Sequence, residues 1–196
     1  NFYHDRNYDV FAILADVRNG RGFAGVVTGD GFNIIAPPRG LPANVSPEVR
    51  NLWEEIGDHT PSWLLVSEIL AFDWNQTTRH DGVITADQYF AWRACARARP
   101  DGGWSGDVMG QGVETVSPAR LDELITLGVV SPPPTSPPRH QFANVQPAAD
   151  GKQYFARVSW SEPYAESAAQ FLSILIAHIV PLAPPDQLRL VFWFDS

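Results

Sequence analysis

Four segments of the chain carry apolar residues at intervals of three and four, the spacing of a helix that buries one face. The first runs from Asp9 to Arg18, where Asn7 can cap the start and Asn19-Gly20 can end the helix. The other three begin at N-terminal signals, in which a hydroxyl residue precedes proline or stands three residues before glutamine. These predicted helices span residues 47–56, 86–97 and 118–127, after Ser46, Thr85 and Ser117.

Strand signals are fewer, and the clearest is the alternation of apolar side chains from Leu188 to Phe194. Tyr154 to Trp160 alternates in a similar way, and Phe23 to Thr28 is short, apolar and β-branched. Shorter elements are expected as extended segments at 62–66 and 82–84 and as a helix at 67–72.

The longest predicted helix lies near the C-terminus. It starts at Glu162-Pro163, runs to about Val180 and is apolar almost all round, so we expect it to be central and buried. Several helices and few strands in mixed order predict an α+β fold, with a small mixed or antiparallel sheet packed against the helices. The length of 196 residues fits a single globular domain over residues 1–196, with a proline-rich surface crossover at about 130–139.

Composition and charge narrow the classes of function. A formal net charge of -8 argues against a non-specific nucleic-acid binder but leaves room for a local basic pocket. The single cysteine, Cys95, excludes an internal disulfide and a paired-cysteine zinc site, and it favours a reducing, cytoplasmic location. The longest apolar run, at 171–183, is too short and too polar to span a bilayer, and the first residues show no signal peptide. We therefore expect no membrane partner.

The first candidate for chemistry is the segment DHTPSW, from Asp58 to Trp63. A histidine beside an acid and hydroxyls can act as a general base, which would make Asp58, His59 and Ser62 the catalytic residues of a hydrolase. Adjacent side chains diverge, however, so a triad built from this segment alone is disfavoured. The alternative is that His59 and the hydroxyls of Thr60 and Ser62 bond the loop backbone and cap the next helix.

Arginines that border apolar segments are the second candidate, because a guanidinium suits bidentate contacts with carboxylate or phosphate. Arg39, in a stiff Pro-Pro-Arg-Gly loop, is suited to clamp an anion if the fold brings it to the His59–Trp63 segment. Arg18, at the expected helix end, can simply complement the helix dipole. Trp74 can stack on a ring but more often such a residue fills a core. The predicted ligand-binding residues are Arg18, Arg39, His59, Thr60, Ser62, Trp63 and Trp74, and we expect no cofactor and no metal ligand set.

Three blocks of sequence occur in the order RNYDVFAILADVR at 6–18, PPRGLPANVS at 37–46 and HTPSWL at 59–64. Together these blocks resemble an uncharacterised protein family of bacteriophage and bacterial genomes. Family members often have a second histidine in the third block, where this chain has Pro61, and a Met-Cys-Asp-Ile-His start that this chain lacks. The resemblance implies a phage-type protein, which would act in the host cytoplasm if phage-encoded, and it implies no established activity.

Three functions stay open at this point. The first is a phage-type accessory protein that binds a small anionic ligand, nucleotide-derived ones included, with sequestration against a host defence as one use. The second is a hydrolase that uses His59. The third is an inhibitor of a host protein that acts by surface contact, around Trp104 or the proline-rich segment. The sequence does not decide whether the protein is an enzyme or whether it forms homo-oligomers.

Overall fold

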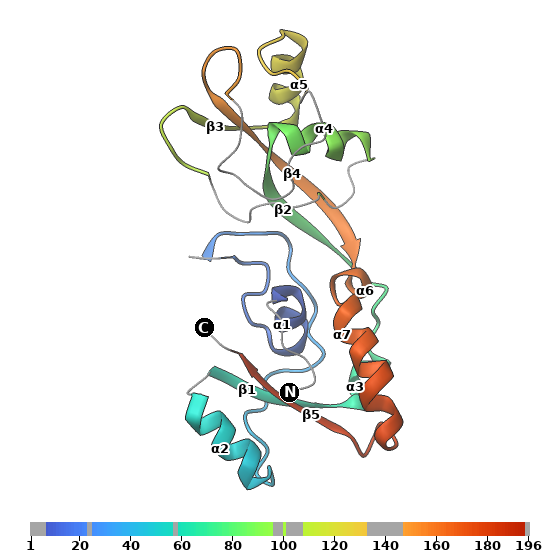
Figure 1. The fold of residues 1–196 in the computed structure, drawn as a ribbon. Helices are drawn as coiled ribbons and strands as arrows, with labels where there is room; N and C mark the ends of the chain where they lie inside the picture. The colour runs from blue at the N-terminus through green and yellow to red at the C-terminus, as the bar shows by residue number, and fades with distance from the viewer. Residues whose placement is uncertain are drawn as a thin grey trace. The chain divides into compact units, whose positions relative to one another are not determined.

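Two compact units, each with its own buried core, make up the chain (Figure 1). The computed structural model describes residues 7–22, 25–56, 59–95, 100, 108–132 and 147–194. Helices accompany a two-stranded and a three-stranded sheet, so the predicted α+β fold is confirmed. The single domain over residues 1–196 stays a prediction. Unit 1 comprises Asn1–Asn19, Gly31–Thr77 and Pro163–Ser196, and unit 2 comprises Gly20–Asp30 and Thr78–Glu162.

Unit 1 is built on an antiparallel pair of strands, β1 (His59–Leu65) and β5 (Arg189–Phe194). Successive residues of a strand point to opposite faces, and residues paired across antiparallel strands share a face. Leu64 is paired with Leu190 on one face, and both side chains are buried. Trp63 therefore points to the other face, where it is half-buried.

Helix α1 (Tyr8–Ala15) covers the buried face of this strand pair. Val10 and Leu14 lie one helical turn apart and pack in one core cluster with Leu64 and Leu190. All four side chains are at most 8% exposed, so this contact holds β1 firmly in the core of unit 1.

The two ends of α1 differ in how well local sequence predicts them. Asn7 caps the start as predicted, because its side chain accepts a hydrogen bond from the amide of Val10. The end predicted at Arg18 is wrong, since the helix stops at Ala15. Asp16 adopts a left-handed conformation with φ of 59°, which ends the helix early and leaves Arg18 in the turn that follows.

Two further helices of unit 1 flank β1 along the chain, α2 (Pro47–Ile56) and α3 (Val66–Ala71). Helix α2 has the predicted bounds, and the hydroxyl of Ser46 accepts a hydrogen bond in its first turn. Helix α3 places Val66 and Ile69 in the core of unit 1, where both are 0% exposed.

The predicted C-terminal helix is present as a run of short helical elements. Its buried side chains include Tyr164, Phe171 and Leu175, whereas Ile176 and His178 are exposed. A buried C-terminal helix is thus roughly confirmed, although one side of it faces solvent. Among the described residues no helix has the length and apolar character needed to cross a membrane. The elements are α6 (Tyr164–Ser167), α7 (Ala169–Ile174), the π-helical η3 (Leu175–Ile179) and the 3-10 helix η4 (Val180–Leu182).

Unit 2 is built on a three-stranded sheet in the order β2-β4-β3. Strand β4 pairs in parallel with β3 and runs opposite to β2 (Figure 1). Two helices, α4 and α5, complete the core, in which Tyr89 and Leu121 are 0% exposed. The bounds are β2 (Thr77–Thr85), α4 (Ala86–Ala94), β3 (Val113–Val116), α5 (Pro118–Thr126) and β4 (Gln153–Pro163).

Local signals predict the helices of unit 2 better than its strands. Thr85 and Gln88 form the predicted capping box of α4, each side chain accepting the amide of the other residue. Ser117 caps α5 as predicted. Strands β2 and β4 are longer than expected, and β3 was not predicted because it follows a glycine-rich stretch. These strands depend on partners that are distant in sequence, which hydrophobic spacing alone does not identify.

The strand predicted at 23–28 is not present in the described part of that segment. Val27 forms an isolated bridge with Arg21, and Gly29 forms one with His80 on β2, while residues 23–24 lie outside the described residues. The proline-rich crossover at 130–139 and Trp104 also fall largely or wholly outside them. The inhibitor hypothesis that relied on these segments therefore stays a prediction.

Candidate functional site

Two arginine side chains converge on the indole ring of Trp63. The guanidinium carbon of Arg39 lies 4.6 Å from the ring centroid, and that of Arg189 lies 5.4 Å from it. Both distances fall within the range of about 6 Å for cation–π interactions. Together with Glu68, which binds Arg39, these residues form the Trp63 cluster, and all four belong to unit 1.

Strand register explains why Arg189 reaches Trp63. Arg189 is paired with Leu65 across the two strands, so Trp63 is its diagonal neighbour on the same face. Diagonal neighbours lie about 7–8 Å apart, within reach of an arginine side chain. Both side chains are half-buried, so the ring and the guanidinium stay partly open to solvent.

Arg39 comes from a separate loop that is held against β1. Its backbone amide donates a hydrogen bond of 3.0 Å to Oγ of Ser62, which is 1% exposed. Pro37 and Pro38 precede it and restrict the backbone there. The expected meeting of the Arg39 loop with the segment around Ser62 and Trp63 is therefore present. That these residues bind a ligand stays a prediction.

Glu68 holds the guanidinium of Arg39 in a bidentate contact. Nη1 of Arg39 lies 2.8 Å from Oε2 of Glu68, and Nη2 lies 2.6 Å from Oε1. Oε2 also accepts the amide of Leu65 at 2.8 Å, at the start of α3. The hydrogen bond from Arg39 lowers the pKa of Glu68, and the same bond raises the pKa of Arg39. The two groups are therefore both charged at neutral pH.

Positive charge is in excess at the Trp63 cluster. Arg189 donates a hydrogen bond of 3.0 Å to the neutral side chain of Asn44, and it forms no ion pair with any described residue. The cluster therefore holds two cations and one carboxylate, that of Glu68, which pairs with Arg39. Such a local excess contrasts with the formal net charge of -8 of the whole chain.

The predicted catalytic segment is not assembled around Ser62. His59 is exposed, and its Nδ1 lies 3.1 Å from Oγ1 of the adjacent Thr60. Within the described residues no hydrogen bond joins His59 to Ser62, whose hydroxyl is turned to the covered face and accepts the amide of Arg39. Asp58 lies outside the described residues. The hydroxyl within reach of His59 is therefore that of Thr60.

Thr60 has an unusual backbone conformation. Its φ of 53° lies in the left-handed region, which is rare for a β-branched residue. The register of β1 against β5 shifts between His59 and Ser62, so Thr60 sits in an irregular stretch of the strand. Strain of this kind occurs often at functional sites, although a bulge alone also accounts for it.

The other two predicted ligand-binding residues make their contacts elsewhere in unit 1. The guanidinium of Arg18 lies over the ring of Tyr8, with its carbon 4.8 Å from the centroid. Nε1 of Trp74 donates a hydrogen bond of 2.8 Å to the carbonyl of Ile69, and the ring packs against the core of unit 1. No hydrogen bond, ion pair or ring contact between described residues joins either side chain to the Trp63 cluster. Trp74 therefore packs against this core, and its role in ligand binding stays a prediction.

Glu68 and Arg189 were not predicted as members of a site. Glu68 follows Ser67 at the start of a predicted helix. An acid at this position complements the helix dipole, so its presence there does not indicate a site. Arg189 alternates with apolar residues in a strand, which indicates only that it points away from the core. Their partners Arg39 and Trp63 are distant in sequence, so no spacing rule connects them.

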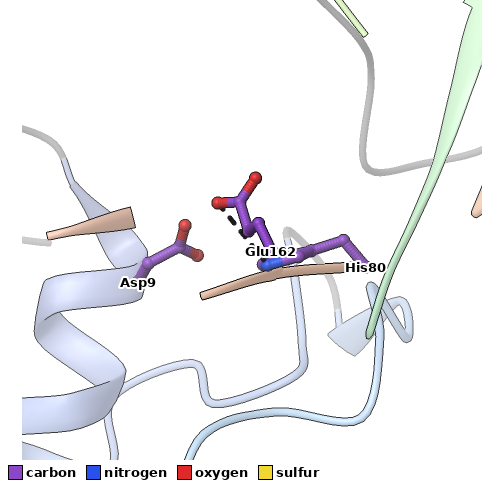
Figure 2. Close-up of side chains that lie close together, drawn as sticks. All are labelled: Asp9, His80 and Glu162. Atoms are coloured by element: carbon purple, nitrogen blue, oxygen red, sulfur yellow. Dashed lines mark ion pairs between the residues drawn. The ribbon is translucent and has the colours of Figure 1, made fainter. Parts of the chain in front are cut away.

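A second polar cluster lies in unit 2, on β2 and β4. Nε2 of His80 lies 3.8 Å from Oε1 of Glu162, an ion pair when the histidine is protonated (Figure 2). Trp160 stacks on the ring of His80 at 5.3 Å, and its Nε1 donates a hydrogen bond of 3.2 Å to Oε2 of Glu162. Asp9, also labelled in Figure 2, belongs to unit 1. His80 and Glu162 are two side chains of a kind that can bind a metal ion, fewer than the three or four protein ligands of common zinc sites.

Protein-family models, curated protein sequences and solved structures were compared with the chain, and none of them matches it. The resemblance to a phage and bacterial family therefore stays a prediction.

Proposed function

We propose that the protein binds a small anionic ligand at the Trp63 cluster, and that the ligand belongs to the phosphate-bearing, nucleotide-derived class. The observation that carries this proposal is the convergence of Arg39 and Arg189 on one half-buried indole. Glu68 pairs with Arg39, whereas Arg189 forms no ion pair with any described residue. Excess positive charge beside apolar surface favours an anion, because partial desolvation strengthens the attraction.

The stacking geometry suits recognition of an anion. A guanidinium that rests on an aromatic ring keeps its N–H donors in its own plane, where they can reach a ligand at the edge of the ring. Asn44 fixes one nitrogen of Arg189, and Glu68 fixes two nitrogens of Arg39. Each guanidinium has five N–H donors, so donors are left over on both.

Sequestration of a nucleotide signal is the biological use that fits this proposal together with the phage-type resemblance. A protein that only sequesters needs tight binding and no chemistry at the ligand. It would act in the host cytoplasm and would need no cofactor.

A thermal-shift screen tests the proposal. Phosphate, pyrophosphate, nucleotides and cyclic nucleotides are added at matched ionic strength, and a ligand that binds the folded state raises Tm by mass action. Arg189→Gln should weaken binding about tenfold or more, because one charge-assisted contact is lost. Arg120→Gln is the matched control, since it removes an exposed arginine of unit 2 that pairs with Glu123. Absence of stabilisation by every anion would overturn the proposal.

A hydrolase that uses His59 is a second candidate, favoured by the 3.1 Å contact of Nδ1 with the hydroxyl of Thr60 and by the left-handed backbone of Thr60. A histidine in hydrogen-bond reach of a hydroxyl can activate it as a nucleophile. Hydrolysis of p-nitrophenyl acetate and p-nitrophenyl phosphate by the protein and by His59→Asn provides the test. Equal rates for the two proteins would exclude this candidate.

A further inference from the structure

Glu68 already presents to Arg39 the kind of group that a ligand would present. Its two carboxylate oxygens accept from two nitrogens of Arg39 at 2.8 and 2.6 Å, the planar fork that also recognises phosphate. The side chains are 28% and 32% exposed, so a dissolved anion can approach the same donors. The contact lies at the surface and is open to exchange.

We infer that Glu68 competes with the ligand for Arg39. Glu68 occupies the guanidinium until an anion of higher charge replaces it. This inference rests on the proposed function of the Trp63 cluster. If another monoanion takes the place of the Glu68 carboxylate, the net charge around Arg39 does not change. A dianionic phosphate brings a second negative charge, and Arg189, which forms no ion pair with any described residue, lies over the same indole ring as Arg39.

The anchoring of Glu68 makes this exchange feasible without unfolding the helix. Oε2 accepts the amide of Leu65, in addition to its contact with Arg39. The carboxylate therefore keeps one hydrogen bond when the guanidinium turns to a ligand. Arg39 in turn keeps its backbone bond to Ser62, so only the side chain has to move.

Competition predicts which ligands the cluster accepts. Phosphate and pyrophosphate should bind, whereas acetate and chloride should not, because one negative charge does not outweigh the resident carboxylate. A nucleoside monophosphate carries the same dianionic group and should bind through it. The selected class is thus a phosphate monoester or an inorganic phosphate of at least two charges.

The decisive experiment is calorimetric titration of the full chain and of Glu68→Gln with inorganic phosphate and with pyrophosphate. The substitution raises the local charge by one unit and keeps an amide oxygen for Leu65, so we expect binding to strengthen about tenfold. Glu123→Gln makes the same chemical change at an ion pair of unit 2 and should leave binding unchanged. Glu68→Ala should also strengthen binding, which guards against an effect peculiar to glutamine.

Three results are distinguishable. Tighter binding in both Glu68 variants supports the inference. If the unaltered protein binds phosphate and both Glu68 variants bind it equally or more weakly, the competitor role is overturned. The anion site itself then remains in place. Absence of binding in all proteins, Glu68 variants included, overturns the proposed function and this inference with it.

Discussion

The backbone amide of Arg39 donates a hydrogen bond of 3.0 Å to the hydroxyl of Ser62, a side chain with 1% exposure on the covered face of β1. This one bond ties the Pro-Pro-Arg-Gly loop to the strand that carries Trp63. It holds the Arg39 loop beside the indole, and it gives Ser62 a structural role. The position of Arg39 in the Trp63 cluster follows from this bond, whereas that of Arg189 follows from the register of β5 against β1.

Removal of that hydroxyl should destabilise unit 1. Ser62→Ala leaves the amide of Arg39 without its acceptor, so we expect the free energy of unfolding in urea to fall by about 1–2 kcal/mol. Ser159→Ala is a suitable control, because it also removes a hydrogen-bonded hydroxyl, which donates to Oδ1 of Asp81 at 2.6 Å. That site is exposed, so water replaces the lost bond and the cost should be about 0.5 kcal/mol or less. A smaller loss for Ser62→Ala than for the control would contradict the assignment.

Stability should fall in acid partly through Glu68. Arg39 lowers the pKa of this carboxyl in the folded state, below the value of about 4.3 in an unfolded chain. The stabilisation is therefore fully present above about pH 4.3 and is lost as pH falls through the lower folded-state pKa. Urea unfolding at a series of pH values from 6 to 3 measures this.

Glu68→Gln should reduce this loss of stability in acid without abolishing it. Tyr154 lowers the pKa of Asp150 as well, through a hydrogen bond from its hydroxyl, and that contribution remains in the variant. An unchanged acid dependence in Glu68→Gln would show that the pair with Arg39 does not contribute to folding.

Thr60→Gly should stabilise the protein slightly. The left-handed conformation at φ 53° costs a β-branched residue about 1–2 kcal/mol, and glycine adopts it freely. Glycine also loses more chain entropy on folding, so the net gain should be about 1 kcal/mol or less, measured as a rise in Tm. A fall in Tm beyond that produced by His59→Ala, which breaks the same side-chain contact, would refute the idea of strain.

Gly29→Ala should destabilise unit 2 strongly. A Cβ atom there would lie 2.0 Å from the carbonyl oxygen of Arg79 on β2, and its φ is 145°. Backbone has to move to relieve such an overlap, so we expect a loss of more than about 2 kcal/mol in urea unfolding. Gly25→Ala is the control, because it also has a positive φ of 78° but no atom within 4 Å. Equal costs for the two substitutions would mean that the close approach at Gly29 is relieved easily.

Residues close together in the sequence determined the features that could be predicted. The capping bonds of Asn7, Thr85 and Ser117 each join residues three apart, and the alternation in β5 repeats every second residue. These signals are local, so they hold whatever the rest of the chain does. They established the α+β class and the start of each capped helix.

Tertiary structure alone decided the candidate site. Ser62 lies 23 residues from Arg39, and Glu68 lies 29 residues from it, so neither contact is visible as a spacing. Arg189 meets Trp63 only because β5 pairs with β1 in one register, and a shift by one residue would send its side chain to the other face. Local sequence set the strands and caps, whereas the pairing of distant strands and the closure of a loop brought two arginines to one tryptophan.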